Sequence, residues 1–188
     1  MIQKIMERKN ITVHDLSLMS GVPYSTVKNI CSQKARIEQC TAKTIYRLAK
    51  ALGVSMEELV EKQMHYRHSF DWFRSETCHR VKRLGDLDFL IEMLTGNEIE
   101  KYYEWEWYRE AFYLLAMVDY LSRVNDVPLC NKYDWLRCRK LDRPIFPTGV
   151  LILAEVSEGK EYLEKAVKKA IPEFARYNIM EGEIRDVC

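Results

Sequence analysis

The sequence predicts an all-α protein, and three observations support this fold class. Only seven glycines and five prolines occur among 188 residues, of which 47% are hydrophobic, so the composition is that of a compact chain rather than a disordered one. Hydrophobic residues recur at the spacing of amphipathic helices. Capping residues precede these segments, and glycines follow several of them. We expect one domain in residues 1–63 and a second in residues 64–188, with no Gly/Pro/Ser-rich linker between them.

The first two helices are expected within residues 2–20. Ile2–Lys9 has the pattern of an amphipathic helix. Thr12 is a good N-cap for the second helix, with an acid three residues later that completes a variant of the capping box. The apolar residues Leu16 and Met19 follow at helical spacing, and Gly21 ends the helix.

Three further helices are expected before residue 63. Pro23 presets the backbone for a helix over Tyr24–Ser32. Thr41 is the N-cap of a fourth helix, Ala42–Leu52, which Gly53 would end. A second capping box, Ser-x-x-Glu at residues 55–58, starts a fifth helix that runs to about residue 62.

The spacing within residues 13–32 predicts a helix-turn-helix. A small residue, Ser17, lies four positions before Gly21, and Val27 and Ile30 follow six and nine positions after that glycine. Two helices that cross steeply need a small side chain at their contact, a glycine free to adopt positive φ in the turn, and branched apolar residues on the second helix.

With this register, the chain resembles the lambda Cro/C1-type (Xre-like) helix-turn-helix family. The segments LSLMSGVPYSTVKNI and TIYRLAKALGVSMEELV carry the resemblance, which extends over residues 1–63. It implies a five-helix DNA-binding domain of a transcriptional regulator, a repressor, whose second motif helix, Tyr24–Ser32, enters the DNA major groove. It also implies a homodimer on a palindromic site, with half-sites roughly 34 Å apart.

The resemblance and the helical phase together identify candidate DNA contacts. Lys28 can donate to guanine and Asn29 can pair with adenine, whereas Thr26 is expected near the backbone phosphates. The residues expected to contact bases are Tyr24, Ser25, Lys28 and Asn29. The residues expected to contact phosphates are Thr26, Lys34, Lys43 and Thr44. The alternative is a small helical bundle whose outward polar residues are only solvated.

The chain departs from the family pattern at three places. Gln33 stands where the family usually ends the recognition helix with glycine, and Val13 stands where a polar phosphate contact is common. The stretch Lys34–Cys40 lacks the usual proline. We expect an altered loop after the recognition helix and one phosphate contact fewer.

The charge distribution agrees with a DNA-binding N-terminal domain. Residues 1–50 hold nine Lys or Arg against three acids, so this segment carries +6 while the formal net charge of the chain is +1. The remaining residues are therefore acidic overall. A basic module favours the phosphate backbone of double-stranded DNA as its partner.

The C-terminal domain is also expected to be α-helical. Helices are expected over Phe70–Leu84, Leu87–Leu94, Asn97–Asn125 and Tyr133–Arg139. The prolines of Pro144–Ala154 favour an extended segment there, after which an amphipathic pattern over Gly159–Tyr177 is interrupted at Pro172. The apolar run Ala111–Leu121 belongs in the centre of a bundle or in a dimer seam.

Five aromatic residues gather within seven positions of this domain, interleaved with glutamates. The acids would repel phosphate, so we expect these rings to pack in the core or between domains, or to form a protein-protein contact, rather than to stack on bases. They are Tyr102, Tyr103, Trp105, Trp107 and Tyr108.

The sequence contains little that indicates catalysis or metal binding. The phosphate-binding, dinucleotide, zinc-protease and serine-hydrolase motifs are absent, so we expect no enzyme and no cofactor. His65-x-x-His68 with Cys78-His79 lacks the paired spacing of zinc sites, and Asp86-x-Asp88 is better explained as the start of a helix. The six cysteines follow no disulfide pattern, and no apolar run approaches the roughly 20 residues of a membrane helix, so we expect a cytoplasmic protein.

Two further functions remain open alongside the regulator. Residues 71–90, 108–126 and 171–179 resemble, in texture only, the C-terminal half of antitoxin-like regulators encoded beside toxin genes. That resemblance implies a C-terminal domain that masks a toxin while the helix-turn-helix regulates its own operon. The third alternative is an enzyme that uses the helix-turn-helix only as a fold.

Overall fold

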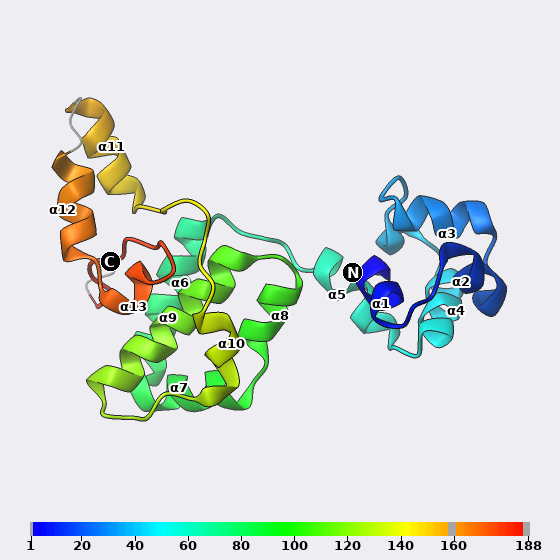
Figure 1. Ribbon diagram of the computed structural model, residues 1–188, viewed down its shortest axis with the longest axis horizontal. Helices are drawn as coiled ribbons and strands as arrows, with labels where there is room; N and C mark the ends of the chain where they lie inside the picture. The colour runs from blue at the N-terminus through cyan, green and yellow to red at the C-terminus, as the bar shows by residue number, and fades with distance from the viewer. Residues whose placement is uncertain (1, 158–160, 186–188) are drawn as a thin grey trace. The chain divides into compact units, whose positions relative to one another are not determined.

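The computed structural model describes residues 2–157 and 161–185, and these residues fold into helices without a strand. The all-α prediction is therefore confirmed for the described residues. One isolated parallel bridge joins Ile145 and Ile179. The chain divides into two compact units, unit 1 over Met1–Arg67 and unit 2 over His68–Cys188 (Figure 1). In the described residues, no helix is long and apolar enough to cross a bilayer.

Unit 1 contains the predicted helices, with most boundaries within two residues of those expected. Ala42–Leu52 has the predicted bounds, and Thr41 and Gly53 are its caps. The bounds of the elements of unit 1 are α1 Ile2–Arg8, α2 Val13–Ser20, α3 Tyr24–Cys31, the 3-10 turn η1 Ile37–Gln39, α4 Ala42–Leu52 and α5 Met56–Met64.

The core of unit 1 lies between these helices and is entirely apolar at its centre. Leu16 of α2, Val27 of α3 and Leu48 of α4 are fully buried, and Leu59 of α5 is nearly so. Met19, the other apolar residue at helical spacing on α2, is 57% exposed. The buried residues of α2 are instead Leu16 and Ser20, which lie four positions apart on one side of the helix.

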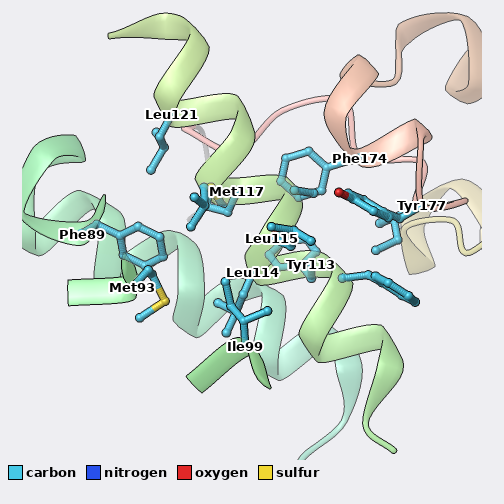
Figure 2. Close-up of a cluster of buried hydrophobic side chains, with 14 of the residues drawn as sticks. Phe89, Met93, Ile99, Tyr113, Leu114, Leu115, Met117, Leu121, Phe174 and Tyr177 are labelled. Carbon is cyan, nitrogen blue, oxygen red and sulfur yellow. The ribbon is translucent and has the colours of Figure 1, made fainter. Parts of the chain in front are cut away.

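Unit 2 is built around one buried helix. Helix α9, Tyr108–Val124, is buried at every position from Glu110 to Asp119, as the apolar run predicted. Figure 2 shows Phe89 and Met93 on one side of it and Phe174 and Tyr177 on the other. The remaining elements of unit 2 are α6 Phe70–Leu84, α7 Asp86–Thr95, α8 Glu98–Glu104, η2 Asn131–Tyr133, α10 Asp134–Arg137, α11 Thr148–Val156, α12 Glu161–Lys169 and α13 Pro172–Ala175.

The single helix expected over Asn97–Asn125 is wrong, because the chain breaks between α8 and α9. Glu106 adopts φ 65°, the left-handed conformation that ends a helix. Trp105, next to the break, is buried, and its ring centroid lies 5.1 Å from that of Trp107. The break thus allows the aromatic residues to pack on one another inside unit 2, and Tyr102 and Tyr103 pack against the α9 core.

The extended segment expected over Pro144–Ala154 is also wrong in its second half. Helix α11 begins at Thr148, directly after Pro147, which occupies the N-cap position. Proline is disfavoured within a helix but is well tolerated at its start, so the last proline of the segment initiates a helix instead of preventing one. Gly159, where the next amphipathic pattern was expected to begin, lies outside the described residues.

Candidate nucleic-acid interface

The N-terminus of α2 is fixed by reciprocal hydrogen bonds between two side chains and the backbone. The amide of Asp15 donates to the Thr12 hydroxyl over 3.1 Å, and the amide of Thr12 donates to the Asp15 carboxylate over 3.0 Å. The predicted capping box is therefore present. Its hydrogen bonds from Thr12 lower the pKa of Asp15.

The turn between α2 and α3 is held by a glycine and two serines. Gly21 adopts φ 64°, and its amide donates to the Ser17 carbonyl over 3.0 Å. The Ser17 hydroxyl reaches forward to the Val22 carbonyl over 2.8 Å, while the Ser20 hydroxyl accepts from the Val22 amide over 3.2 Å. Both polar groups of Val22, a residue whose amide is buried in the turn, are thus satisfied by side chains. Small size accounts for only part of the choice of serine at position 17, since its hydroxyl also closes the turn.

Helix α3 presents one apolar face and one polar face. Val27 and Ile30 are buried against the rest of unit 1, which fixes the rotation of the helix about its axis. The four residues expected to contact bases lie on the opposite face and are exposed, as helical phase predicts. Tyr24, the largest of them, is 48% exposed. These four residues are Tyr24, Ser25, Lys28 and Asn29.

The residues expected near phosphates lie on α3, after α3, and at the start of α4. Lys34 and Lys43 are exposed, whereas Thr26 and Thr44 are half-buried. The Thr44 amide donates to the Thr41 hydroxyl over 3.3 Å, so Thr44 lies in the capped first turn of α4. The N-terminus of a helix carries partial positive charge and exposed amides, which suits a phosphate.

Comparison with models of known protein families gave a match in the N-terminal part of the chain. The family model of the Cro/C1-type HTH DNA-binding domain matches residues 1–63. Residues 1–63 are a Cro/C1-type helix-turn-helix domain. Searches of curated proteins and of solved structures found no significant match. The antitoxin-like resemblance of the C-terminal half therefore has no support from these comparisons.

Two departures from the family pattern have a structural explanation in this helix-turn-helix domain. Gln33 adopts φ 58°, so it occupies the left-handed conformation for which the family usually has glycine. Val13 is half-buried and packs against the core of unit 1, which explains an apolar residue there. The polar position at the start of α2 is instead the next residue, His14.

His14 is a candidate interface residue that sequence reasoning missed. Its side chain is exposed, and its ring centroid lies 6.4 Å from that of Tyr24 at an interplanar angle of 56°. The start of α2 and the start of α3 are therefore neighbours on the surface of the helix-turn-helix domain. The signal in the sequence was its place directly after Val13, but only the fold shows that it lies beside Tyr24.

In unit 2, Cys78, His68 and Asp86 are engaged in core packing, ring stacking and an ion pair. Cys78 is buried, with its sulfur 3.4 Å from the Tyr113 hydroxyl, and burial raises the pKa of its thiol, which disfavours the reactive thiolate. The His68 ring stacks on Trp72 with centroids 3.9 Å apart. Asp86 starts α7 and binds Arg185 over 2.7 Å. Within the described ranges, no three His, Cys, Asp or Glu side chains form a group that could hold a metal ion.

Proposed function

We propose that this protein is a sequence-specific, DNA-binding repressor of transcription. The observation that carries the proposal is the exposed polar face of α3 on a Cro/C1-type helix-turn-helix domain. An exposed helix with this framework can enter the major groove, which is wide enough to admit it. Repression requires only that the bound protein occupies the operator, so no activating surface has to be assumed.

Each candidate side chain has a role that its chemistry suits. Lys28 would donate to the O6 and N7 atoms of guanine, and Asn29 would pair through two hydrogen bonds with adenine. Tyr24 and Ser25, in the first turn of α3, would contact bases or the adjacent backbone. The phosphate contacts of Thr26, Lys34, Lys43 and Thr44 would set the register of the domain on the duplex without specifying sequence.

The proposal includes two copies of the chain on one operator. A single recognition helix reaches few base pairs, so one copy supplies little discrimination against the many competing sites of a genome. Two copies related by a two-fold axis would read half-sites roughly 34 Å apart on a pseudo-palindrome. Residues 64–188 would supply the contact between copies, and the protein would act in the cytoplasm.

The experiment that tests the proposal is selection of bound duplexes from a random pool with the full chain. The expected result is an enriched pseudo-palindrome whose affinity falls steeply with salt concentration, because phosphate contacts release counterions. Lys28→Ala should weaken binding to the selected site by about 1–3 kcal/mol. Lys82→Ala, an exposed lysine of α6, is the matched control that also removes one positive charge.

Uniform weak binding to every duplex would contradict the proposal. The antitoxin alternative has its own outcome in the same preparation: a toxin that co-purifies through residues 68–188 and is neutralised by the full chain. Turnover of a substrate by the full chain, with DNA binding unaffected by Lys28→Ala, would favour the enzyme alternative.

A further inference from the structure

Helix α11 is apolar almost throughout its length, yet none of its residues is buried. Val150 and Ala154, four positions apart, are half-buried on one side of the helix. The remaining large side chains are 47–78% exposed, namely Leu151, Ile152, Leu153 and Val156. A helix that is hydrophobic on all sides normally lies inside a protein, so this one lacks most of the packing that its composition calls for.

The neighbour of α11 is α12, and together they form a helical hairpin (Figure 1). The base of this hairpin is tied to α6 by the Thr148 hydroxyl, which donates to the Asp71 carboxylate over 2.5 Å. Helix α12 also has no buried residue. The hairpin, at one end of unit 2, therefore carries exposed apolar side chains on α11 and, at Val167, on α12.

Helix α12 adds a shallow apolar groove to this surface. The groove has a volume of about 390 Å³ and is lined by Leu163 and Val167, with Glu164 and Lys168 beside them. Val167 is itself 50% exposed. We call the exposed apolar side chains of α11, together with this groove, the hairpin face. Exposed apolar surface of this kind commonly marks a protein-protein contact.

The charges of α12 are arranged so that the helix complements itself. Its first turns carry Glu161 and Glu164, and its last turns carry Lys168 and Lys169. Neither Glu164 nor Lys168 forms an ion pair with another described residue. Under a two-fold axis perpendicular to the helix, two copies of α12 run antiparallel, which places Glu164 of each copy near Lys168 of the other.

We infer that the hairpin face binds the hairpin face of a second copy of this chain. Two hairpins would then form a four-helix arrangement, which is a stable way to bury apolar stripes of antiparallel helices. Each helix of the hairpin has nine residues, so a four-helix arrangement would align about two and a half turns of each helix. The inference rests on the proposed function in one respect, namely that two copies are required, and it names the surface that joins them.

The first experiment compares two exposed isoleucines of unit 2. Ile152→Glu places a charge in the hairpin face, whereas Ile91→Glu makes the same change on α7, away from that face. The two side chains are 54% and 60% exposed, so neither substitution should disturb folding. In sedimentation velocity of the full chain, we expect a wild-type dimer, an unchanged Ile91→Glu dimer, and an Ile152→Glu dissociation constant raised by at least about 30-fold.

The second experiment uses charge reversal to identify the occupant. Glu164→Lys and Lys168→Glu should each weaken the homodimer by about threefold to tenfold, because each places like charges opposite one another. A mixture of the two variants should form a heterodimer of near wild-type affinity, since the reversed charges then meet complementary ones. If each substitution weakened the dimer only by disturbing its own α12 helix, mixing the two variants would not restore the affinity.

Two results would overturn the inference: a wild-type chain that stays monomeric, or a dimer that Ile152→Glu leaves intact. The second result is separate from failure of the proposed function, because the two copies could still meet through another surface of unit 2. A dimer that responds to the substitutions as expected but binds all duplexes equally would refute sequence-specific DNA binding. It would still support the contact between the two hairpins. An Ile152→Glu monomer that still binds one isolated half-site weakly would support both.

Discussion

Helices α4 and α8 end in the same way but with different residues. After α4 the Val54 amide donates to the Ala49 carbonyl over 3.1 Å, and after α8 the Trp107 amide donates to the Tyr102 carbonyl over 2.9 Å. Both belong to the Schellman pattern, which requires one residue in the left-handed conformation. That residue is Gly53 at φ 63° in unit 1 and Glu106 at φ 65° in unit 2.

The difference shows where the signal that ends each of these two helices resides. Gly53 adopts positive φ without the steric penalty of a Cβ atom, so the residue type at this one position is enough to end α4. Glu106 has that penalty, and its conformation is maintained by tertiary packing around the buried Trp105. We therefore expect single local substitutions to have moderate effects in unit 1, and loss of one buried partner to have large effects in unit 2.

The largest effect is expected for Arg137→Ala in unit 2. The Asp119 carboxylate is buried on α9, and Arg137 donates to it from Nε over 3.0 Å and from Nη2 over 2.7 Å. Removing the guanidinium leaves a buried charge without its main partner, which should lower the free energy of unfolding by about 3–5 kcal/mol. Urea denaturation followed by circular dichroism measures this change.

Arg123→Ala is the matched control for that substitution. Arg123 also binds a carboxylate, that of Glu173 over 2.6 Å, but its side chain is more than half exposed. Its loss should lower the free energy of unfolding far less than the loss of Arg137, because an exposed ion pair contributes little. Equal effects of the two substitutions would contradict the role assigned to burial.

An intermediate effect is expected for Gly21→Ala in unit 1. A Cβ atom at this position would meet nothing within 4 Å, so the only penalty is that of an alanine at φ 64°. That penalty is about 1–2 kcal/mol in the free energy of unfolding. Thermal denaturation of the variant should show it, and an unchanged melting temperature would mean that the turn relaxes to another conformation.

The opposite sign is expected for Gln33→Gly. Gln33 already has positive φ, so glycine removes a steric penalty and should raise the free energy of unfolding by up to about 1 kcal/mol, reduced by the greater freedom of glycine in the unfolded chain. The same denaturation experiment compares both variants with the wild type. Destabilisation by Gln33→Gly would show that contacts of the glutamine side chain outweigh its backbone strain.

The smallest effect concerns the pH dependence of unit 2. The hydrogen bond from Arg185, joined by one from Asn125, lowers the pKa of Asp86 below its ordinary value of 3.8. The stabilisation is therefore complete above that ordinary value and is lost as pH falls through the lowered pKa of the folded state. Because Arg185 is half exposed, the contribution should be below about 1 kcal/mol.

Asp86→Asn tests this contribution in a pH series of urea denaturations. The variant should be less stable than the wild type at neutral pH, and the difference should shrink toward acid pH. A difference that grows as the pH falls would contradict the assigned direction of the pKa shift.

The helix boundaries of unit 1 could be predicted because their signals are local. Thr41 and Gly53 determine both ends of α4 from within a few residues. The polar face of α3 follows equally directly from the burial of Val27 and Ile30. In contrast, the ring contact between His14 and Tyr24 joins two helices, and the residue periodicity of either helix does not indicate it.

Unit 2 was harder to predict because packing overrides its local signals. Neither a glycine nor a proline marks the break at Glu106, and the prolines before α11 suggested an extended segment. Most positions of α11 are apolar, which indicates burial, yet the single chain leaves them exposed. A hydrophobic pattern predicts that a residue is buried, but it does not indicate whether the same chain or a second copy buries it.

The central claim is that α3 reads bases through its exposed polar face, and the most direct measurement is a base-pair scan of the selected operator with wild type and Asn29→Ala. For the wild type, replacing the adenine that Asn29 contacts should weaken binding by about 1–3 kcal/mol. For Asn29→Ala that penalty should disappear, while penalties at the other base pairs stay as they were. Identical penalties for the two proteins at every position would contradict the claim.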